Sequence, residues 1–401
     1  MLRIASGAGR GCPGTGASCA ATDRRASLGH GEIRKPEAGA APGALGRPRA
    51  SFTRLNGTLA LVAILFATHP RFKDHATGAG HPERPARLDA VLEGANWAGV
   101  ADDLVTVELR AATREEMERV HPARFLDALE RLCENGGGRI DADTRASEAS
   151  WDAACLAAGA GLASIEMLDA SDATAAFCAV RPPGHHATPT RAMGFCLVNN
   201  VAIAAAALAA RGERVVIVDY DAHHGNGTQD CFYRDPRVMY VSFHEYPLYP
   251  GTGALSEVGE GEGRGTTINF PFPAGTTGDS YRAAIDDVLA GAIDQFKPTW
   301  MILSAGFDGH RRDPLTGLSL SAGDFADITA RLIEHVPAGR RLVFLEGGYD
   351  LQALSDSTAA CLGALAGVQH HPERPTAGGP GAPVVAAVRR VRESLDGHVS
   401  G

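Results

Sequence analysis

The stretch that decides the fold of this 401-residue chain is Val215-Val216-Ile217-Val218-Asp219-Tyr220-Asp221-Ala222-His223-His224-Gly225. Its first four residues are continuously apolar and β-branched, which is typical of a strand buried on both faces of a parallel sheet. Polar residues follow directly, and open parallel sheets bind their ligands at the carboxyl ends of the strands. The stretch therefore predicts an α/β fold with its chemistry at one edge of the sheet.

The same alternation continues on both sides of this strand, which we expect at 214–219. Other apolar runs of strand length lie at 59–67, 174–180, 237–243, 266–271, 299–304 and 341–346. Segments of helical character lie at 84–97, 121–134, 150–168, 199–211, 279–296, 322–336 and 351–366. Strands separated by helices of this length indicate βαβ crossovers. We therefore predict a single three-layer domain, with a mostly parallel sheet between layers of helices.

The two ends of the chain differ from its body. Residues 1–57 are rich in Gly, Ala, Pro, Arg and Ser without an apolar period, which predicts a disordered extension. An Arg-rich, acid-poor start also resembles a transit peptide, and a translation start placed too far upstream explains it equally well. We expect the catalytic domain over 58–370. In the tail, 371–401, valines at 384, 385, 388 and 391 follow helical spacing and predict a docking helix.

Charge and cysteine content narrow the class of protein. The formal net charge is −9, and residues 1–57 carry +6 of their own, so the remainder carries −15. An acidic body argues against direct nucleic-acid binding. The eight cysteines show no CxxC spacing, which favours reduced thiols and a cytoplasmic protein. The longest apolar run, 59–67, is too short for a membrane span, and nothing in the sequence indicates an oligomeric state.

A metal centre is the first chemical prediction. Asp221 and His223 stand two residues apart just after a strand, so their side chains face the same side of an extended segment. Asp308 follows the run at 299–304 and would come from a second strand end. Two carboxylates and one imidazole suit Zn²⁺ with an open position for water, although Fe²⁺ or Co²⁺ fits the same set.

Each part of this centre has a simpler explanation when taken alone. A lone Asp-x-His is weak evidence, Asp308 fits a helix cap, and the pair His185-His186 or the turn before Tyr349 fits an ordinary loop. Together these explanations require four coincidences at one sheet edge. A two-metal site of the arginase type would need Asp-x-His-x-Asp, and the fifth position here is Gly225, which favours a single metal.

Several stretches closely resemble the histone deacetylase and acetylpolyamine amidohydrolase superfamily, particularly class II deacetylases and their bacterial relatives. The matching stretches are GHPERPARL at 80–88, VRPPGHHA at 180–187, MGFCLVNN at 193–200, VDYDAHHGNGTQ at 218–229, LYPGTG at 248–253, SAGFDGHRRDPL at 304–315 and LEGGY at 345–349. Their order and spacing agree over about residues 60–370. The resemblance implies an arginase-like domain and a metal-dependent amidohydrolase that removes acyl groups from amines.

The resemblance also implies catalytic roles. Zinc on Asp221, His223 and Asp308 would activate a water and polarise the substrate carbonyl. His186 would be the general base and would then protonate the leaving amine. His185, paired to Asp219, would stay cationic. The remaining catalytic residues are Asn226, which would hydrogen-bond His186 as in class II members, and Tyr349, which would donate to the oxyanion.

Substrate contacts are implied at the tunnel. The Gly194 carbonyl would accept a hydrogen bond from the substrate amide, and Phe195 and Tyr249 would line the two walls. Tyr249 departs from the Phe that the family often has there. Leu315 stands where polyamine-specific enzymes of the class IIb branch have an acidic residue, which favours acyl-lysine or a less charged acyl-amide.

Three further implications stay open at this stage. The backbone of Asp219, Asp221, His223 and Phe243, with the Ser242 hydroxyl, matches the structural potassium site of the family. Acetylpolyamine deacetylation is the main alternative activity. A non-catalytic acyl-lysine binding module is the alternative from another class.

Overall fold

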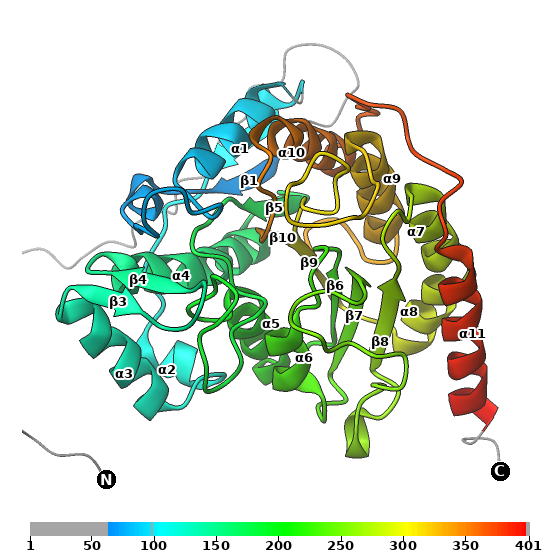
Figure 1. Ribbon diagram of the computed structural model, residues 1–401, viewed down its shortest axis with the longest axis horizontal. Helices are drawn as coiled ribbons and strands as arrows, with labels where there is room; N and C mark the ends of the chain where they lie inside the picture. The colour runs from blue at the N-terminus through cyan, green and yellow to red at the C-terminus, as the bar shows by residue number, and fades with distance from the viewer. Residues whose placement is uncertain (1–62, 98, 398–401) are drawn as a thin grey trace, which may run out of the picture. The chain divides into compact units, whose positions relative to one another are not determined.

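The structure is a computed structural model that describes residues 63–97 and 99–397 (Figure 1). The predictions for residues 1–57 fall outside the described residues. Within the described chain a parallel sheet of eight strands forms the centre. In spatial order the strands are β2 Leu104–Thr106, β1 Ile64–Ala67, β5 Ala175–Cys178, β10 Arg341–Leu345, β9 Trp300–Ala305, β6 Val215–Asp219, β7 Val238–Glu245 and β8 Thr267–Phe272.

Helices cover both faces of this sheet. In Figure 1, α1, α10 and α9 lie along one side of the strands, and α4 and α5 lie along the other. The helices are α1 Ala86–Trp97, α2 Arg114–Glu118, α3 Ala123–Glu134, α4 Ser150–Ala170, α5 Asn200–Ala210, α6 Asn226–Phe232, α7 Gly278–Ala284, α8 Ala290–Phe296, α9 Ala322–Ile333, α10 Leu351–Leu365 and α11 Ala382–Gly397. The chain thus has the single α/β domain that its alternating pattern predicts.

The sequence explains why the layers lie close together. Val215 to Val218 of β6 have no solvent exposure, as a strand between two helical layers requires. Helix α4 is rich in Ala and Gly, and most of its residues are buried. A Cβ on Gly161 would lie 2.3 Å from Cζ of Phe344 in β10, so a larger residue there would require the buried Phe344 ring to shift.

Helix α4 is also long and apolar enough to cross a membrane by composition alone. It is mostly buried in the described domain, however, where it packs against β1, β5, β10 and α5. Its apolar character therefore has a sufficient explanation in the core of the domain.

Several elements were absent from the sequence prediction. These are α2, α6, the edge strand β2, the antiparallel pair β3 Gly137–Arg139 and β4 Arg145–Ser147, and the 3₁₀ turns at Pro70–Lys73, Ala101–Asp103 and Gly261–Gly263. The segment predicted as one helix over 279–296 consists of α7 and α8 joined by a π-helical turn at Ile285–Leu289. In the C-terminal segment, α11 packs against β8 and α7 and buries Val385 and Val388.

The order of the strands positions the site. Strands β5, β10, β9 and β6 are consecutive in space although they are far apart in sequence. The segments with candidate site residues follow these strands at their carboxyl ends: 181–186 after β5, 346–349 after β10, 306–308 after β9 and 220–226 after β6. The sheet therefore brings them to one edge, as the sequence predicts.

Candidate active site

The predicted metal ligands lie together at this edge. One ligand atom each from Asp221, His223 and Asp308 lies within 4.8 Å of the other two. Nδ1 of His223 is 3.2 Å from Oδ1 of Asp221 and 2.9 Å from Oδ2 of Asp308. Both carboxylates are essentially buried. Two strand ends thus bring these three side chains together, and metal binding by them stays a prediction.

The surroundings of the two carboxylates fit a bound cation. Within the described residues neither carboxylate forms an ion pair with Lys or Arg, so histidines are their only charged partners there. A Cβ on Gly347 would lie 2.5 Å from Oδ2 of Asp308 and 2.6 Å from Oδ2 of Asp221. Because Gly347 has no side chain, the region next to Oδ2 of Asp221 and Oδ2 of Asp308 is not filled by a Cβ. A dication bound by these two oxygens would balance the negative charge of the carboxylates.

Backbone amides orient the same carboxylates. Gly347 N–H donates to Oδ2 of Asp221 at 2.8 Å, and Ala222 N–H donates to Oδ1 of Asp308 at 2.8 Å. Burial and the nearby Asp221 charge raise the pKa of Asp308 to about 7. Two neighbouring buried carboxylates repel one another and are costly to ionise without a cation, whereas a bound metal ion would stabilise both charges.

The paired histidines lie beside the triad. Nδ1 of His185 is 3.0 Å from Oδ2 of Asp219, and Nδ1 of His186 is 2.8 Å from Oδ1 of Asn226. The two imidazole rings lie 4.1 Å apart between centroids. Each ring therefore has one nitrogen fixed by a side chain and the other available toward the triad.

The two histidines differ in charge. Burial alone would lower the pKa of His185, but the carboxylates of Asp221 and Asp219 outweigh it and raise the pKa to about 10. Burial lowers the pKa of His186 well below its usual range, and the positive charges of His185 and His223 add to this effect. A cationic and a neutral imidazole thus stand side by side, which suits one for electrostatic support and the other for proton transfer.

Tyr349 lies at the same edge, after β10. Its ring packs edge-on against Phe195 at 5.8 Å and under the guanidinium of Arg87 at 5.0 Å. Its backbone N–H donates to Oδ2 of Asp313 at 2.7 Å. Burial raises the pKa of the Tyr349 phenol well above its usual value, so the hydroxyl is a neutral donor.

The remaining predicted substrate contacts surround this centre. Gly194 adopts a φ of +55°, and a Cβ there would lie 2.4 Å from Cδ2 of His186. The Tyr249 ring meets His186 edge-on at 5.1 Å and is 38% exposed. Leu315 is 37% exposed, and its N–H donates to Oδ1 of Asp313, the carboxylate that also holds Tyr349. The site is open to solvent on the side of Tyr249 and Leu315.

The residues assigned to a potassium site lie next to the triad. Ser242 and Phe243 are buried in β7, and Ser242 is the register partner of Asp219 in β6. The Ser242 hydroxyl lies 2.9 Å from Nδ1 of His244. This geometry does not test a cation site, which stays a prediction.

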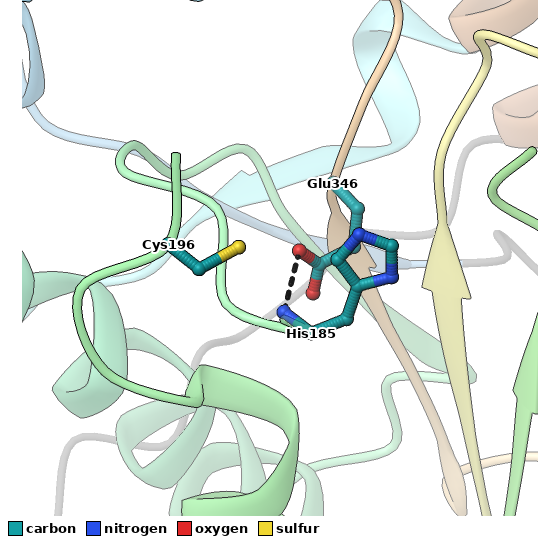
Figure 2. A group of neighbouring side chains, drawn as sticks. All are labelled: His185, Cys196 and Glu346. Atoms are coloured by element: carbon teal, nitrogen blue, oxygen red, sulfur yellow. Dashed lines mark hydrogen bonds between the residues drawn. The ribbon is translucent and has the colours of Figure 1, made fainter. Parts of the chain in front are cut away.

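A second group of side chains that could ligate a metal includes one member of the histidine pair. It consists of His185, Cys196 and Glu346, all three buried (Figure 2). Oε2 of Glu346 already accepts N–H donors from Gly184 and His185, and the Cys196 thiol donates to the Gly194 carbonyl at 3.3 Å. Burial and the Glu346 charge raise the pKa of this thiol well above its usual value. A protonated thiol and an occupied carboxylate make a poor metal site.

Sequence reasoning missed several residues that support the site. Glu346 and Asp313 were not assigned, although both lie inside motifs that were quoted. Glu83 was also missed. It forms buried ion pairs with Arg181 and Arg87, and Arg87 in turn donates to the backbone carbonyls of Glu346 and Gly348. Such partners are visible only when the strand order is known.

Comparisons with known proteins agree with this geometry. A family model described as the histone deacetylase domain matches residues 81–365. A probable deacetylase of Archaeoglobus fulgidus is 38% identical over 306 residues, which is 75% of this chain and 85% of that protein. A histone deacetylase-like amidohydrolase of Pseudomonas aeruginosa is 35% identical over 300 residues, covering 73% of this chain and 78% of that protein.

Two further similarities extend the range of relatives. Histone deacetylase 10, chloroplastic, of Oryza sativa is 36% identical over 326 residues, covering 76% of this chain and 73% of that protein. The crystal structure of the HDA15 HD domain matches with a TM-score of 0.77 at 34% identity, covering 85% of this chain and 99% of that one. The fold thus has a counterpart among solved structures, and the histone deacetylase domain model spans the segments that form the candidate site.

Proposed function

Because the chain belongs to the histone deacetylase family and is a hydrolytic deacetylase, we propose that it uses one zinc ion to hydrolyse the amide of N-acyl-lysine or a related acylated amine. The observation that carries this proposal is the convergence of Asp221, His223 and Asp308 beside two histidines of different charge. In this proposal these three residues hold the metal. Zinc, when bound, supplies a Lewis acid and lowers the pKa of its water to about 7.

The histidine pair handles the protons. Nδ1 of His186 is held by Asn226, so Nε2 takes the proton from water and delivers it to the leaving amine. A depressed pKa keeps this imidazole unprotonated at neutral pH, so the lone pair of its Nε2 is available. His185 stays protonated against Asp219 and provides electrostatic support.

Tyr349 and the tunnel residues position the substrate. The Tyr349 hydroxyl donates a hydrogen bond to the substrate carbonyl oxygen as negative charge develops there. The Gly194 carbonyl accepts from the substrate amide N–H, and Phe195 and Tyr249 enclose the acyl-bearing chain. Leu315 places an uncharged side chain at the open rim, which supports acyl-lysine over an acylated polyamine.

A structural potassium ion is part of the same proposal. The carbonyls of Asp219, Asp221, His223 and Phe243, with the hydroxyl of Ser242, would hold it. The observation that supports this potassium site is the register of β6 and β7, in which Asp219 pairs with Ser242.

We also propose a cytoplasmic protein without direct nucleic-acid or membrane partners. The six described cysteines are free thiols, and the net charge of the chain is −9. The relatives include bacterial proteins and a rice protein named chloroplastic, so organelle import of the Arg-rich residues 1–57 is the alternative. Immunoblots of cell fractions with full-length and Δ1–57 chains distinguish the two locations.

Acetate release tests the proposed activity. The zinc-loaded protein is incubated with an acetyl-lysine peptide and, separately, with an acetylated polyamine, and free acetate is measured. We expect turnover of the peptide to exceed that of the polyamine. Faster polyamine turnover would favour the acetylpolyamine alternative. No turnover of either, with one metal bound per chain, would favour a non-catalytic binding module.

A further inference from the structure

Glu346 is a fully buried carboxylate at the end of β10, directly beside the loop that carries the histidine pair. Strand β10 neighbours β5, and the segment Arg181–His186 follows β5. Figure 2 shows the Glu346 carboxylate next to His185, with Cys196 on its other side. This acid has no place in the chemistry described above.

The carboxylate binds the main chain of the histidine loop. Oε2 of Glu346 accepts N–H donors from Gly184 at 2.7 Å and from His185 at 3.1 Å. The next N–H, that of His186, donates to Sγ of Cys196 at 3.4 Å. Three consecutive buried amides of an irregular segment therefore depend on two side chains for their acceptors, and buried amides are costly to leave unpaired.

The rings and the backbone of the pair are held by different residues. Asp219 at the end of β6 and Asn226 at the start of α6 each fix one ring nitrogen. A ring can keep its distance to the metal triad only if its Cα is fixed as well. In the described residues, Glu346 is the side chain that accepts from the amides preceding both rings.

We propose that Glu346 is a positioning residue for the deacylation proposed above. By accepting from two successive amides, it fixes the Gly184–His185 backbone and so the distance of both imidazoles from the metal ligands. This role requires only one acceptor oxygen, Oε2, at hydrogen-bonding distance from the two amides. Its other oxygen, Oε1, lies 3.3 Å from the Ser304 hydroxyl and is dispensable for this role.

Two conservative variants distinguish the effect of side-chain length from the effect of side-chain charge. Glu346→Gln keeps the length and one oxygen, and its amide N–H₂ group would face the Ser304 hydroxyl, which accepts. Glu346→Asp keeps the charge but withdraws the carboxylate by one methylene. We expect kcat of Glu346→Gln to stay within about threefold of wild type, and that of Glu346→Asp to fall about 100-fold, as for a displaced catalytic group.

A merely structural role would not produce that pattern. KM and bound zinc are expected to change little in either variant, and the unfolding temperature should fall in Glu346→Asp alone, whose shorter side chain leaves buried amides unpaired. Ser304→Ala, which removes the contact with Oε1 only, is the matched control and should keep wild-type kcat. The reverse order, with the Asp variant active and the Gln variant inactive, would overturn the proposal in favour of a purely electrostatic role.

Hydrogen exchange makes the test independent of the assigned activity. Amide exchange of a peptide covering residues 182–187 should be faster in Glu346→Asp and unchanged in Glu346→Gln. Equal exchange in all variants would overturn the inference even if the protein is an active deacylase. Faster exchange in an enzyme that turns over no acyl-lysine would keep the positioning role and reject the proposed substrate.

Discussion

Replacing Tyr349 with Phe is the sharpest test of the proposed chemistry. The change deletes one hydroxyl, and the ring keeps its contacts with Arg87 and Phe195. The backbone N–H that Asp313 accepts is also untouched. Among the residues that the structure describes, no group pairs with the Tyr349 hydroxyl, so the free energy of unfolding should change by less than about 0.5 kcal/mol.

The cost should therefore appear in the reaction. Loss of one donor to a developing oxyanion removes about 2.7–4 kcal/mol of transition-state stabilisation, which corresponds to a 10²–10³-fold lower kcat. Burial keeps the pKa of this phenol well above neutrality, so the loss should be constant across neutral pH. The assay is acetate release under saturating acetyl-lysine peptide, with zinc content measured on the same sample.

A matched variant controls for the loss of any buried phenol. Tyr281 is fully buried, and its hydroxyl has no partner in the described part of the chain. Tyr281→Phe should leave kcat unchanged. A Tyr349→Phe enzyme with wild-type kcat and full zinc content would refute the assigned donor role.

Three further predictions follow from the geometry. Gly347→Ala would bring a methyl group within 2.6 Å of both carboxylates of the proposed metal site, so zinc affinity by titration should fall at least about tenfold; an unchanged Kd would argue against this metal site. Gly194→Ala places its Cβ 2.4 Å from the His186 ring, so kcat should fall about 100-fold at constant zinc content; wild-type kcat would show that this ring is not critical. Burial lowers the pKa of His121 from 6.5 to about 4, where the ring accepts from Asn199 N–H. A depressed histidine pKa means that the unfolded chain binds protons first, so His121 should cost about 2 kcal/mol of unfolding free energy between pH 7 and pH 5. Denaturant titrations of wild type and His121→Gln should show this difference, and parallel pH profiles would contradict it.

The central strands were predictable because a strand that is buried on both faces has apolar residues at nearly every position. Strands such as Val215–Asp219 and Trp300–Ala305 are buried on both faces, so their sequences are continuous apolar runs. The edge strand Leu104–Thr106 has partly exposed residues and only three of them, which gives no readable pattern. Helix α6 was missed for another reason, because it has only seven residues and begins with Asn226-Gly227-Thr228, which are weak helix formers.

The site was predictable where one residue carries a recognisable chemical role. Asp221, His223 and Asp308 could be assigned from residue type and from their position after a strand. Glu346 could not, because its partners, Gly184 and His185, are more than 160 residues away in the chain. Their contact depends on β10 lying beside β5, a neighbour relation that crossovers hide from the sequence.

The backbone around Gly225 gives a physical reason for proposing one metal and not two. A Cβ at this position would lie 2.2 Å from Oδ2 of Asp219 and 2.6 Å from the hydroxyl of Tyr240. The carboxylate that a two-metal centre needs two residues after His223 therefore cannot be introduced without displacing a residue that orients His185. Asp219 and His185 balance one another, and Asp221 with Asp308 can supply two negative charges. A single dication neutralises that pair, and a second one would stand in a buried region without a carboxylate of its own.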